Sequence, residues 1–360
     1  MKAISSSLCP IYMGNDILES ALTKLVPSNC DLAIVYDAAV SEWAHAIEAL
    51  FEKKGHGVCS IPVPSGESSK CRAMKAQIED VMLEYGIDRS ATLIAIGGGV
   101  VTDLAGFVAA TYMRGIKSIL IPTTVLGMVD ASIGGKTGIN TLYGKNLIGA
   151  YHMPAGIVID TSFLQSLPNE MLRSGFAEVI KYGCILNREL FEMLEKSDLY
   201  YERDPAFIEN CIELSVQAKT AVVTHDPHEK GYRRILNFGH TIAHALELLS
   251  EYHLSHGDAV ALGMLGEAYL SMLEKHLSEK EYNRIAQSIA QYEYPPFSLE
   301  EIPFQQFYEA MLRDKKSSHR APRFVLIHSI GKTVSFEEEY CTTVSEENLR
   351  QTYNLLKERS

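Results

Sequence analysis

The first half of the chain alternates short apolar runs with stretches in which apolar positions recur at a helical spacing. The runs rich in Val, Ile and Leu predict buried strands at Leu32–Tyr36, Gly57–Pro62, Thr92–Ile96, Ser118–Ile121 and Ile157–Ile159. The helical spacing predicts helices at Ser41–Lys53, Ser69–Glu84 and Val101–Tyr112. A strand followed by a helix, repeated several times, is typical of a parallel sheet with helical crossovers.

The pattern changes after Leu167, where helical spacing dominates. Helices are predicted at Met171–Cys184, Pro205–Thr224, Thr241–Leu249, Asp258–Leu273, Lys280–Gln291 and Ser345–Arg359, with one hairpin from Arg323–His328 to Thr333–Phe336. We therefore predict an α/β fold class: an N-terminal Rossmann-like α/β domain, residues 1–165, followed by a C-terminal mainly α-helical domain, residues 166–360.

Composition and charge narrow the class of protein. The chain has 360 residues, of which 46% are hydrophobic and 22% charged, as in ordinary globular proteins. Its formal net charge of −12 argues against nucleic-acid and anionic-membrane partners. The seven cysteines are odd in number and irregularly spaced, which does not fit a disulfide framework. With no signal-peptide pattern and no long apolar run, we expect a cytoplasmic protein.

A triple glycine marks a possible nucleotide site. The strand Thr92–Ile96 runs directly into Gly97, Gly98 and Gly99 and then into a helical pattern. Backbone N–H groups at such a turn can approach a pyrophosphate, although the GxGxxG spacing is absent. Asp37, at the end of the first strand, would bind ribose hydroxyls or cap the helix that follows it.

A second glycine-rich stretch surrounds Lys136. It resembles a P-loop, but Asp130 stands where that motif requires glycine, so we exclude a nucleoside triphosphatase of this type. Lys136 and the nearby Lys145 either bind phosphate or carboxylate groups or are solvated loop lysines.

Histidines suggest a metal site. His240 and His244 are four residues apart on one helical face, and His256 begins the next predicted helix. Glu178 interrupts an otherwise apolar helical stretch, where a carboxylate needs a partner. Two histidines, one glutamate and an open position form a typical catalytic zinc site. Spacing alone favours His240 and His244 as the histidine pair.

Taken together, the motifs resemble the 3-dehydroquinate synthase family of the sugar-phosphate cyclase superfamily. The likeness runs from Asp37 to Lys316 and rests on GGGVVTDLAGFVAATYMRG, IPTTVLGMVDASIGGKTGIN, GKNLIGA, GFAEVIKYG, RRILNFGHTIAHALE, HGDAVALGM and MLRDKK. It implies a dehydroquinate synthase-like fold, an active site between the two domains, bound NAD, one divalent metal (zinc or cobalt), and a homodimer.

The resemblance also implies roles for particular residues. The metal ligands would be Glu178, His240 and His256, which leaves His244 to contact the substrate or relay protons. The NAD contacts would be Asp37, Glu67, Lys70, Gly98, Gly99, Asp103, Thr123, Thr124, Lys136, Lys145, Phe163 and Ser166. The substrate and catalytic contacts would be Asp130, Lys136, Asn146, Lys181, Lys219, Glu229, Arg233, Asn237, His244 and Lys315 or Lys316, with Arg114 reaching the substrate phosphate from the partner subunit.

The implied activity is that of a carbon–oxygen lyase in the shikimate pathway, which leads to chorismate and the aromatic amino acids. The enzyme would convert 3-deoxy-D-arabino-heptulosonate 7-phosphate to 3-dehydroquinate and phosphate. The steps would be transient oxidation by NAD, β-elimination of phosphate, re-reduction, ring opening and aldol closure. The alternatives are another cyclase (of the 2-deoxy-scyllo-inosose or epi-valiolone synthase type), a metal-dependent alcohol dehydrogenase, and a non-catalytic binding protein.

Overall fold

The computed structural model describes residues 1–196, 203–313, 321–336 and 339–359. The chain divides into two compact units, Met1–Pro168 and Asn169–Ser360. Among the described helices, none combines the length and the apolar character needed to cross a bilayer.

The first unit is built on a seven-stranded sheet in the order β1-β2-β9-β6-β5-β3-β4. The strands are β1 Lys2–Ile4, β2 Ile11–Gly14, β3 Leu32–Asp37, β4 Val58–Val63, β5 Thr92–Gly97, β6 Lys117–Pro122 and β9 Gly156–Asp160. Neighbouring strands run parallel, except that β1 is antiparallel to β2. The predicted parallel sheet is therefore confirmed, whereas β1 and β2 were not predicted.

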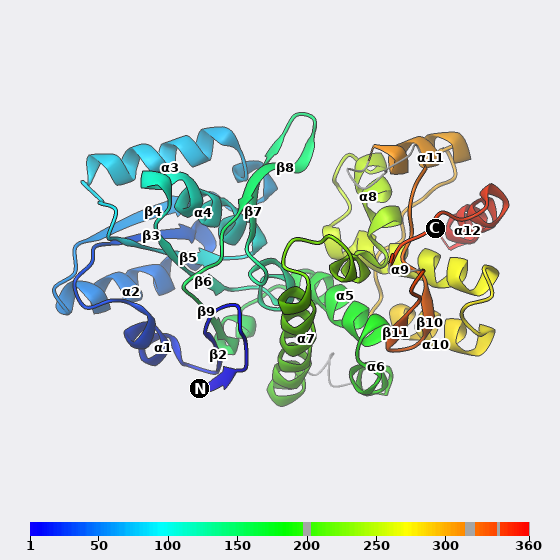
Figure 1. Ribbon diagram of the computed structural model, residues 1–360, viewed down its shortest axis with the longest axis horizontal. Helices are drawn as coiled ribbons and strands as arrows, with labels where there is room; N and C mark the ends of the chain where they lie inside the picture. Colours follow the sequence, from blue (N-terminus) through cyan, green and yellow to red (C-terminus); the bar gives the residue numbers. More distant parts are fainter. Residues whose placement is uncertain (197–202, 314–320, 337–338, 360) are drawn as a thin grey trace. The chain divides into compact units, whose positions relative to one another are not determined.

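Helices cover both faces of this sheet (Figure 1). They are α1 Leu18–Leu25, α2 Ser41–Lys53, α3 Arg72–Glu84 and α4 Gly99–Thr111. Alternate residues of β3, such as Ala33 and Val35, share a buried cluster with Ile78 of α3 and Leu104 of α4. The sheet is buried on both faces, which explains why its strands are apolar almost throughout.

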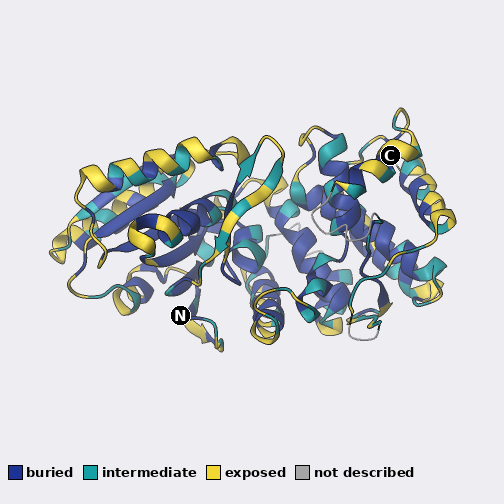
Figure 2. Ribbon diagram, turned by 45° about the horizontal axis from the view of Figure 1, so that its top comes forward, coloured by how far each residue is buried: buried dark blue, intermediate teal, exposed yellow. Residues whose placement is uncertain are grey.

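The first unit also contains a two-stranded hairpin, which packs against α4 and was not predicted from the sequence. It consists of β7 Lys136–Thr141 and β8 Gly144–Tyr151, paired antiparallel. Figure 2 shows the hairpin exposed along much of its length, in contrast to the buried sheet, and Leu142 and Tyr143 at its turn are almost fully accessible. A side chain at Gly149 would overlap the Thr137 carbonyl oxygen, so the close pairing of the two strands requires glycine there.

The second unit is mainly helical, as predicted. Its helices are α5 Asn169–Ile185, α6 Arg188–Glu195, α7 Pro205–His225, α8 His240–Leu249, α9 His256–Leu273, α10 Glu279–Gln291, α11 Phe304–Leu312 and α12 Glu346–Glu358, and its hairpin is β10 Ile327–Ser329 with β11 Lys332–Thr333. Helix α9 packs against α5, α8, α10 and α12 and is buried on every side. The α/β fold class with a helical second part is therefore confirmed.

One prediction in this unit needs correction, and two helices, α6 and α11, were not predicted. The hairpin is shorter than expected because Phe324, predicted to lie in its first strand, pairs instead with Thr342 in an isolated bridge.

Candidate functional site

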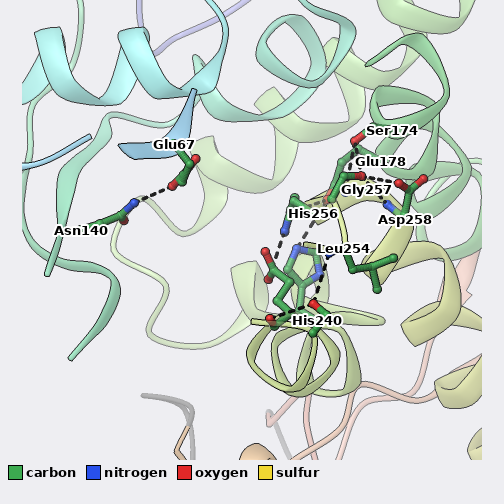
Figure 3. A network of polar contacts seen from close by, with 12 residues as sticks. Glu67, Asn140, Ser174, Glu178, His240, Leu254, His256, Gly257 and Asp258 are labelled. Atoms are coloured by element: carbon green, nitrogen blue, oxygen red, sulfur yellow. Dashed lines mark hydrogen bonds and ion pairs between the residues drawn. The ribbon is translucent and has the colours of Figure 1, made fainter. Parts of the chain in front are cut away.

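Three predicted metal ligands lie together in the second unit. Glu178 lies on α5, while His240 and His256 are the first residues of α8 and α9. One ligand atom from each lies within 4.8 Å of the others. The Nε2 atoms of His240 and His256 lie 3.5 and 3.6 Å from the same carboxylate oxygen, Oε1 of Glu178 (Figure 3). Three helices thus bring two imidazoles to one carboxylate.

Both imidazoles have a second polar contact that fixes their orientation. Nδ1 of His240 lies 3.1 Å from the Phe238 carbonyl oxygen. Because a carbonyl only accepts, Nδ1 donates its proton to it, and Nε2 faces Glu178. Nδ1 of His256 lies 3.6 Å from Oε2 of Glu247. Such support of the second ring nitrogen is usual for histidines that bind metals.

The Glu178 carboxylate is suited to a cation. It is completely buried, and neither oxygen accepts a hydrogen bond of ordinary geometry from a described residue. Lys181, one turn along α5, forms an ion pair with it. A buried carboxylate with two imidazole nitrogens is a donor set that a divalent transition metal accepts, with an open position for substrate. The three residues therefore fit the implied metal.

His244 lies beside this cluster but outside the group within ligand reach. Its ring centre is 5.6 Å from that of His240 and 6.5 Å from that of His256. The structure therefore groups His240 with His256, as the resemblance implies, and not with His244, as spacing alone suggested.

Buried cations accumulate in the same unit. Lys181, Lys219 and Arg233 have accessibilities of 1%, 5% and 2%. They lie on α5, on α7 and on the 3-10 turn Tyr232–Asn237, and these three elements pack against one another. Three buried positive charges in a chain with a net charge of −12 favour an anionic ligand.

The segment before this turn is organised by Asp226, which the sequence analysis missed. Its carboxylate accepts hydrogen bonds from the backbone N–H groups of Lys230, Gly231 and Arg233, at 3.0, 2.8 and 3.1 Å. Burial opposes ionisation, but these donors lower the pKa of Asp226 on balance. Within the segment, Glu229 accepts a hydrogen bond from the Asn237 side chain at 2.8 Å.

In the first unit, the triple glycine lies between β5 and α4. Gly98 precedes the helix and offers no side-chain cap, so the first N–H groups of α4 are left without one. A Cβ at Gly98 would lie 3.2 Å from Cγ2 of Thr124. Thr123 and Thr124 directly follow β6, the parallel neighbour of β5. The residues that follow the carboxyl ends of β5 and β6 therefore lie at the same edge of the sheet. Ligands of open α/β sheets bind at such edges.

Other residues assigned to NAD have partners within the first unit. Lys70 pairs with Asp103 at 2.6 Å. Asp37 accepts a hydrogen bond from Ala39 N at 3.0 Å and caps the short turn Ala38–Val40, in addition to one from Ser65.

Glu67 and Phe163 are also held in place. Glu67 accepts a hydrogen bond from Asn140 at 2.6 Å (Figure 3). The buried Phe163 ring packs on Trp43, 4.7 Å between ring centres, whereas Ser166 is exposed.

Comparison with known proteins identifies the family. Residues 60–174 match the family described as 3-dehydroquinate synthase N-terminal, and residues 175–317 match the one described as 3-dehydroquinate synthase C-terminal. The chain belongs to the 3-dehydroquinate synthase family.

Relatives of the 3-dehydroquinate synthase family cover nearly the whole chain. A 3-dehydroquinate synthase of Desulforamulus reducens is 40% identical, over 91% of this chain and 93% of the relative. One from Microcystis aeruginosa is 41% identical, over 94% and 92%. Among solved structures, 2-epi-5-epi-valiolone synthase of Streptomyces hygroscopicus, with NAD⁺ and Zn²⁺ bound, is 28% identical, has a TM-score of 0.86, and covers 100% of this chain and 99% of that one.

Several residues that the resemblance to 3-dehydroquinate synthases assigns to the site have unusual backbone conformations. Arg114, Asn146 and Glu229 have φ values of 65°, 55° and 56°, in the left-handed region. Asp130 lies in the π-helical turn Gly127–Ala131. Strained residues and π turns are frequent at functional sites. Lys136 and Lys145 lie on β7 and β8, and Lys315 and Lys316 lie outside the described residues.

Three further polar residues near these sites were missed. Asn140 donates to Glu67 and accepts from the Asn146 backbone N–H at 3.0 Å. Glu247 and Glu267 are buried in α8 and α9. Burial raises the pKa of Glu267 to about 8, although backbone N–H groups, Gly239 and Thr241 among them, oppose the rise. Both glutamates are lone acids in apolar helical stretches, which is the signal that identified Glu178.

Metal binding should release a proton from His256. Burial disfavours the charged ring, but the carboxylates of Glu178 and Glu247 outweigh it and raise the pKa of His256 to about 10. A histidine binds a metal through an unprotonated ring nitrogen, so below that pH the metal must displace this proton. The affinity of the protein for the metal therefore rises about tenfold per pH unit from this group alone. Calorimetric titration with Zn²⁺ at about pH 7.5, in two buffers of different ionisation enthalpy, should show about one proton released per metal. No release would contradict the prediction.

Proposed function

We propose that this protein is a 3-dehydroquinate synthase, a lyase that converts 3-deoxy-D-arabino-heptulosonate 7-phosphate to 3-dehydroquinate and phosphate on the route to chorismate. The observation that carries the proposal is the 40% identity to a 3-dehydroquinate synthase over 91% of the chain. The convergence of Glu178, His240 and His256 supports it, because this chemistry needs a metal centre.

NAD and one divalent metal, zinc or cobalt, are the cofactors in this proposal. The valiolone synthase with NAD⁺ and Zn²⁺ bound supports both. When bound, NAD would take a hydride from the substrate and return it, and the metal would polarise the reacting carbon–oxygen bond as a Lewis acid. Glu178, His240 and His256 would hold the metal. The Gly98–Gly99 turn, with Thr123 and Thr124, would receive the nucleotide phosphates.

The remaining assigned residues would bind the substrate and move protons. Lys181, Lys219 and Arg233 would neutralise its phosphate and carboxylate and hold them in place, because buried cations bind such anions strongly. His244, beside the metal ligands, would exchange protons with the reacting hydroxyl, and Glu229 would orient Asn237, as their 2.8 Å hydrogen bond suggests. Asp130, Lys136 and Asn146 would complete the substrate contacts from the first domain, and Lys315 or Lys316 from the second.

We also propose a cytoplasmic homodimer that binds neither nucleic acid nor membranes. The net charge of −12 supports the absence of polyanionic partners. Large apolar side chains at the tip of the β7–β8 hairpin, Leu142 and Tyr143, support self-association, because exposed apolar groups gathered on one element favour an interface. In the dimer, Arg114 would reach the substrate phosphate of the partner subunit.

The decisive experiment measures phosphate release from 3-deoxy-D-arabino-heptulosonate 7-phosphate, with and without NAD and added metal, while the absorbance of NADH is followed. We expect phosphate release that depends on both cofactors and no net NADH. Net NADH production would instead indicate a dehydrogenase. Turnover of sedoheptulose 7-phosphate or glucose 6-phosphate, with no turnover of the heptulosonate phosphate, would indicate another cyclase. The 28% identity to the valiolone synthase is the reason for testing these two substrates.

A further inference from the structure

Two buried glutamates outside the predicted ligand set contact the segments that carry the two histidines. Glu247 lies near the end of α8 and has an accessibility of 3%, while Glu267 lies within α9 and is completely buried. Buried carboxylates are costly unless they are paired or hydrogen-bonded, so their contacts indicate what they do.

Glu247 contacts His256 across the two helices. Its Oε2 lies 3.6 Å from Nδ1 of His256, whose Nε2 in turn lies 3.6 Å from Glu178 Oε1. Residues 240, 244 and 247 fall on one face of α8, because the intervals of four and three match the helical repeat. The face of α8 that carries His240 and His244 therefore also carries the acid that supports the histidine of α9.

Glu267, on α9, supports the end of α8 that carries His240. Helix α8 has no cap from its own N-cap residue, Gly239. That residue has φ +83°, and a Cβ there would lie 2.9 Å from Met264 N, so glycine is required. Oε1 of Glu267 instead accepts a hydrogen bond from Thr241 N at 3.2 Å, at the second residue of the helix. A carboxyl oxygen at this position satisfies a backbone donor and anchors the first turn, which begins with His240.

We propose that Glu247 and Glu267 are positioning residues, which fix His256 and His240 in the orientations required to bind the metal. The exchange is reciprocal: a glutamate of α8 holds the histidine of α9, and a glutamate of α9 holds the helix end that carries the histidine of α8. This inference rests on the metal site of the proposed function and deepens it. The two acids would contribute to metal affinity without touching the metal.

The test compares Co²⁺ affinity, the visible spectrum of bound Co²⁺ and the unfolding of the metal-free protein in single variants. Glu247→Leu and Glu267→Leu remove the acceptor and should weaken Co²⁺ binding about 100-fold. Glu247→Asp and Glu267→Asp keep the carboxyl group but withdraw it by one methylene group, and should weaken binding about tenfold and shift the Co²⁺ absorption. These aspartate variants decide the matter if the leucine variants do not fold. Glu251→Asp, at an exposed position just after α8, is the matched control and should bind as the wild type does.

The outcomes separate this inference from the function on which it rests. If the wild-type protein binds Co²⁺ and the folded variants bind it within twofold of wild type, only the positioning role is overturned. The same conclusion follows if the variants lower the stability of the metal-free protein without changing Co²⁺ affinity or spectrum. If the wild-type protein binds no Co²⁺, the metal site of the proposed function is overturned as well.

Discussion

Replacing Glu178 by glutamine is expected to abolish metal binding and activity together. The carboxylate supplies the only negative charge of the three proposed ligands, and its oxygens are buried beside two imidazoles. We expect activity to fall about a thousandfold or more, equivalent to about 4 kcal/mol of transition-state stabilisation. Bound zinc, measured after dialysis, should fall in parallel. A Glu178→Gln protein that retains zinc with wild-type affinity would contradict the assignment.

Two further variants separate metal loss from misfolding. Glu178→Gln leaves Lys181 buried without its partner, and breaking a buried ion pair costs about 3–5 kcal/mol. The double variant Glu178→Gln/Lys181→Met removes both charges and should recover much of this stability while still binding no zinc. Glu170→Gln, an exposed position on the same helix α5, should leave zinc content and activity unchanged.

Replacing Gly263 by alanine is expected to destabilise the fold strongly. A Cβ at this position of α9 would overlap the carbonyl oxygen of Gly239 and lie 3.1 Å from Ala243 N, so it meets backbone that cannot rotate away. We expect a loss of about 3 kcal/mol in the free energy of unfolding, at the upper end of overpacking effects. Because Gly239 directly precedes His240, zinc binding should weaken as well. Urea unfolding followed by circular dichroism, together with zinc affinity, provides the measurements.

Gly266→Ala is the matched control for this prediction. It lies three residues further along α9, where a Cβ would lie 2.6 Å from the terminal methyl group of Ile242, a flexible side-chain end. We expect a change below about 1 kcal/mol, because alanine is favoured over glycine in helices and offsets the crowding. Equal losses in the two variants would show that the approach of α9 to the Gly239 carbonyl is not tight.

The sequence predicted elements well where burial imposes a clear period. The predicted helix Ser41–Lys53 coincides with α2, and the predicted strand Thr92–Ile96 differs from β5 by one residue. The β7–β8 hairpin was missed because it is glycine-rich and partly exposed, so it has no regular alternation of apolar and polar positions. The first two strands were missed because they are only three and four residues long.

The candidate site could be predicted only in part, because the spacing of residues along the sequence identifies side chains on one face of a single helix and not contacts between helices. His240 and His244 share a face of α8, but His256 comes from a second helix and Glu178 from a third. Only tertiary packing decides which of them meet. Like Glu178, Glu247 and Glu267 are each a lone acid in an apolar helical stretch, so the sequence carries the same signal for both.

His240 and His256 share one further property: each is the first residue of its helix. The positive ends of the backbone dipoles of α8 and α9 therefore both lie at residues that would hold the metal. Each end stabilises a nearby anion by about 0.3–1 kcal/mol. An oxygen atom that gains negative charge there during turnover would be stabilised by peptide groups that can neither lose a proton nor be replaced by mutation. Part of the electrostatic field at the reaction centre thus comes from the backbone of the two helices and not from side chains.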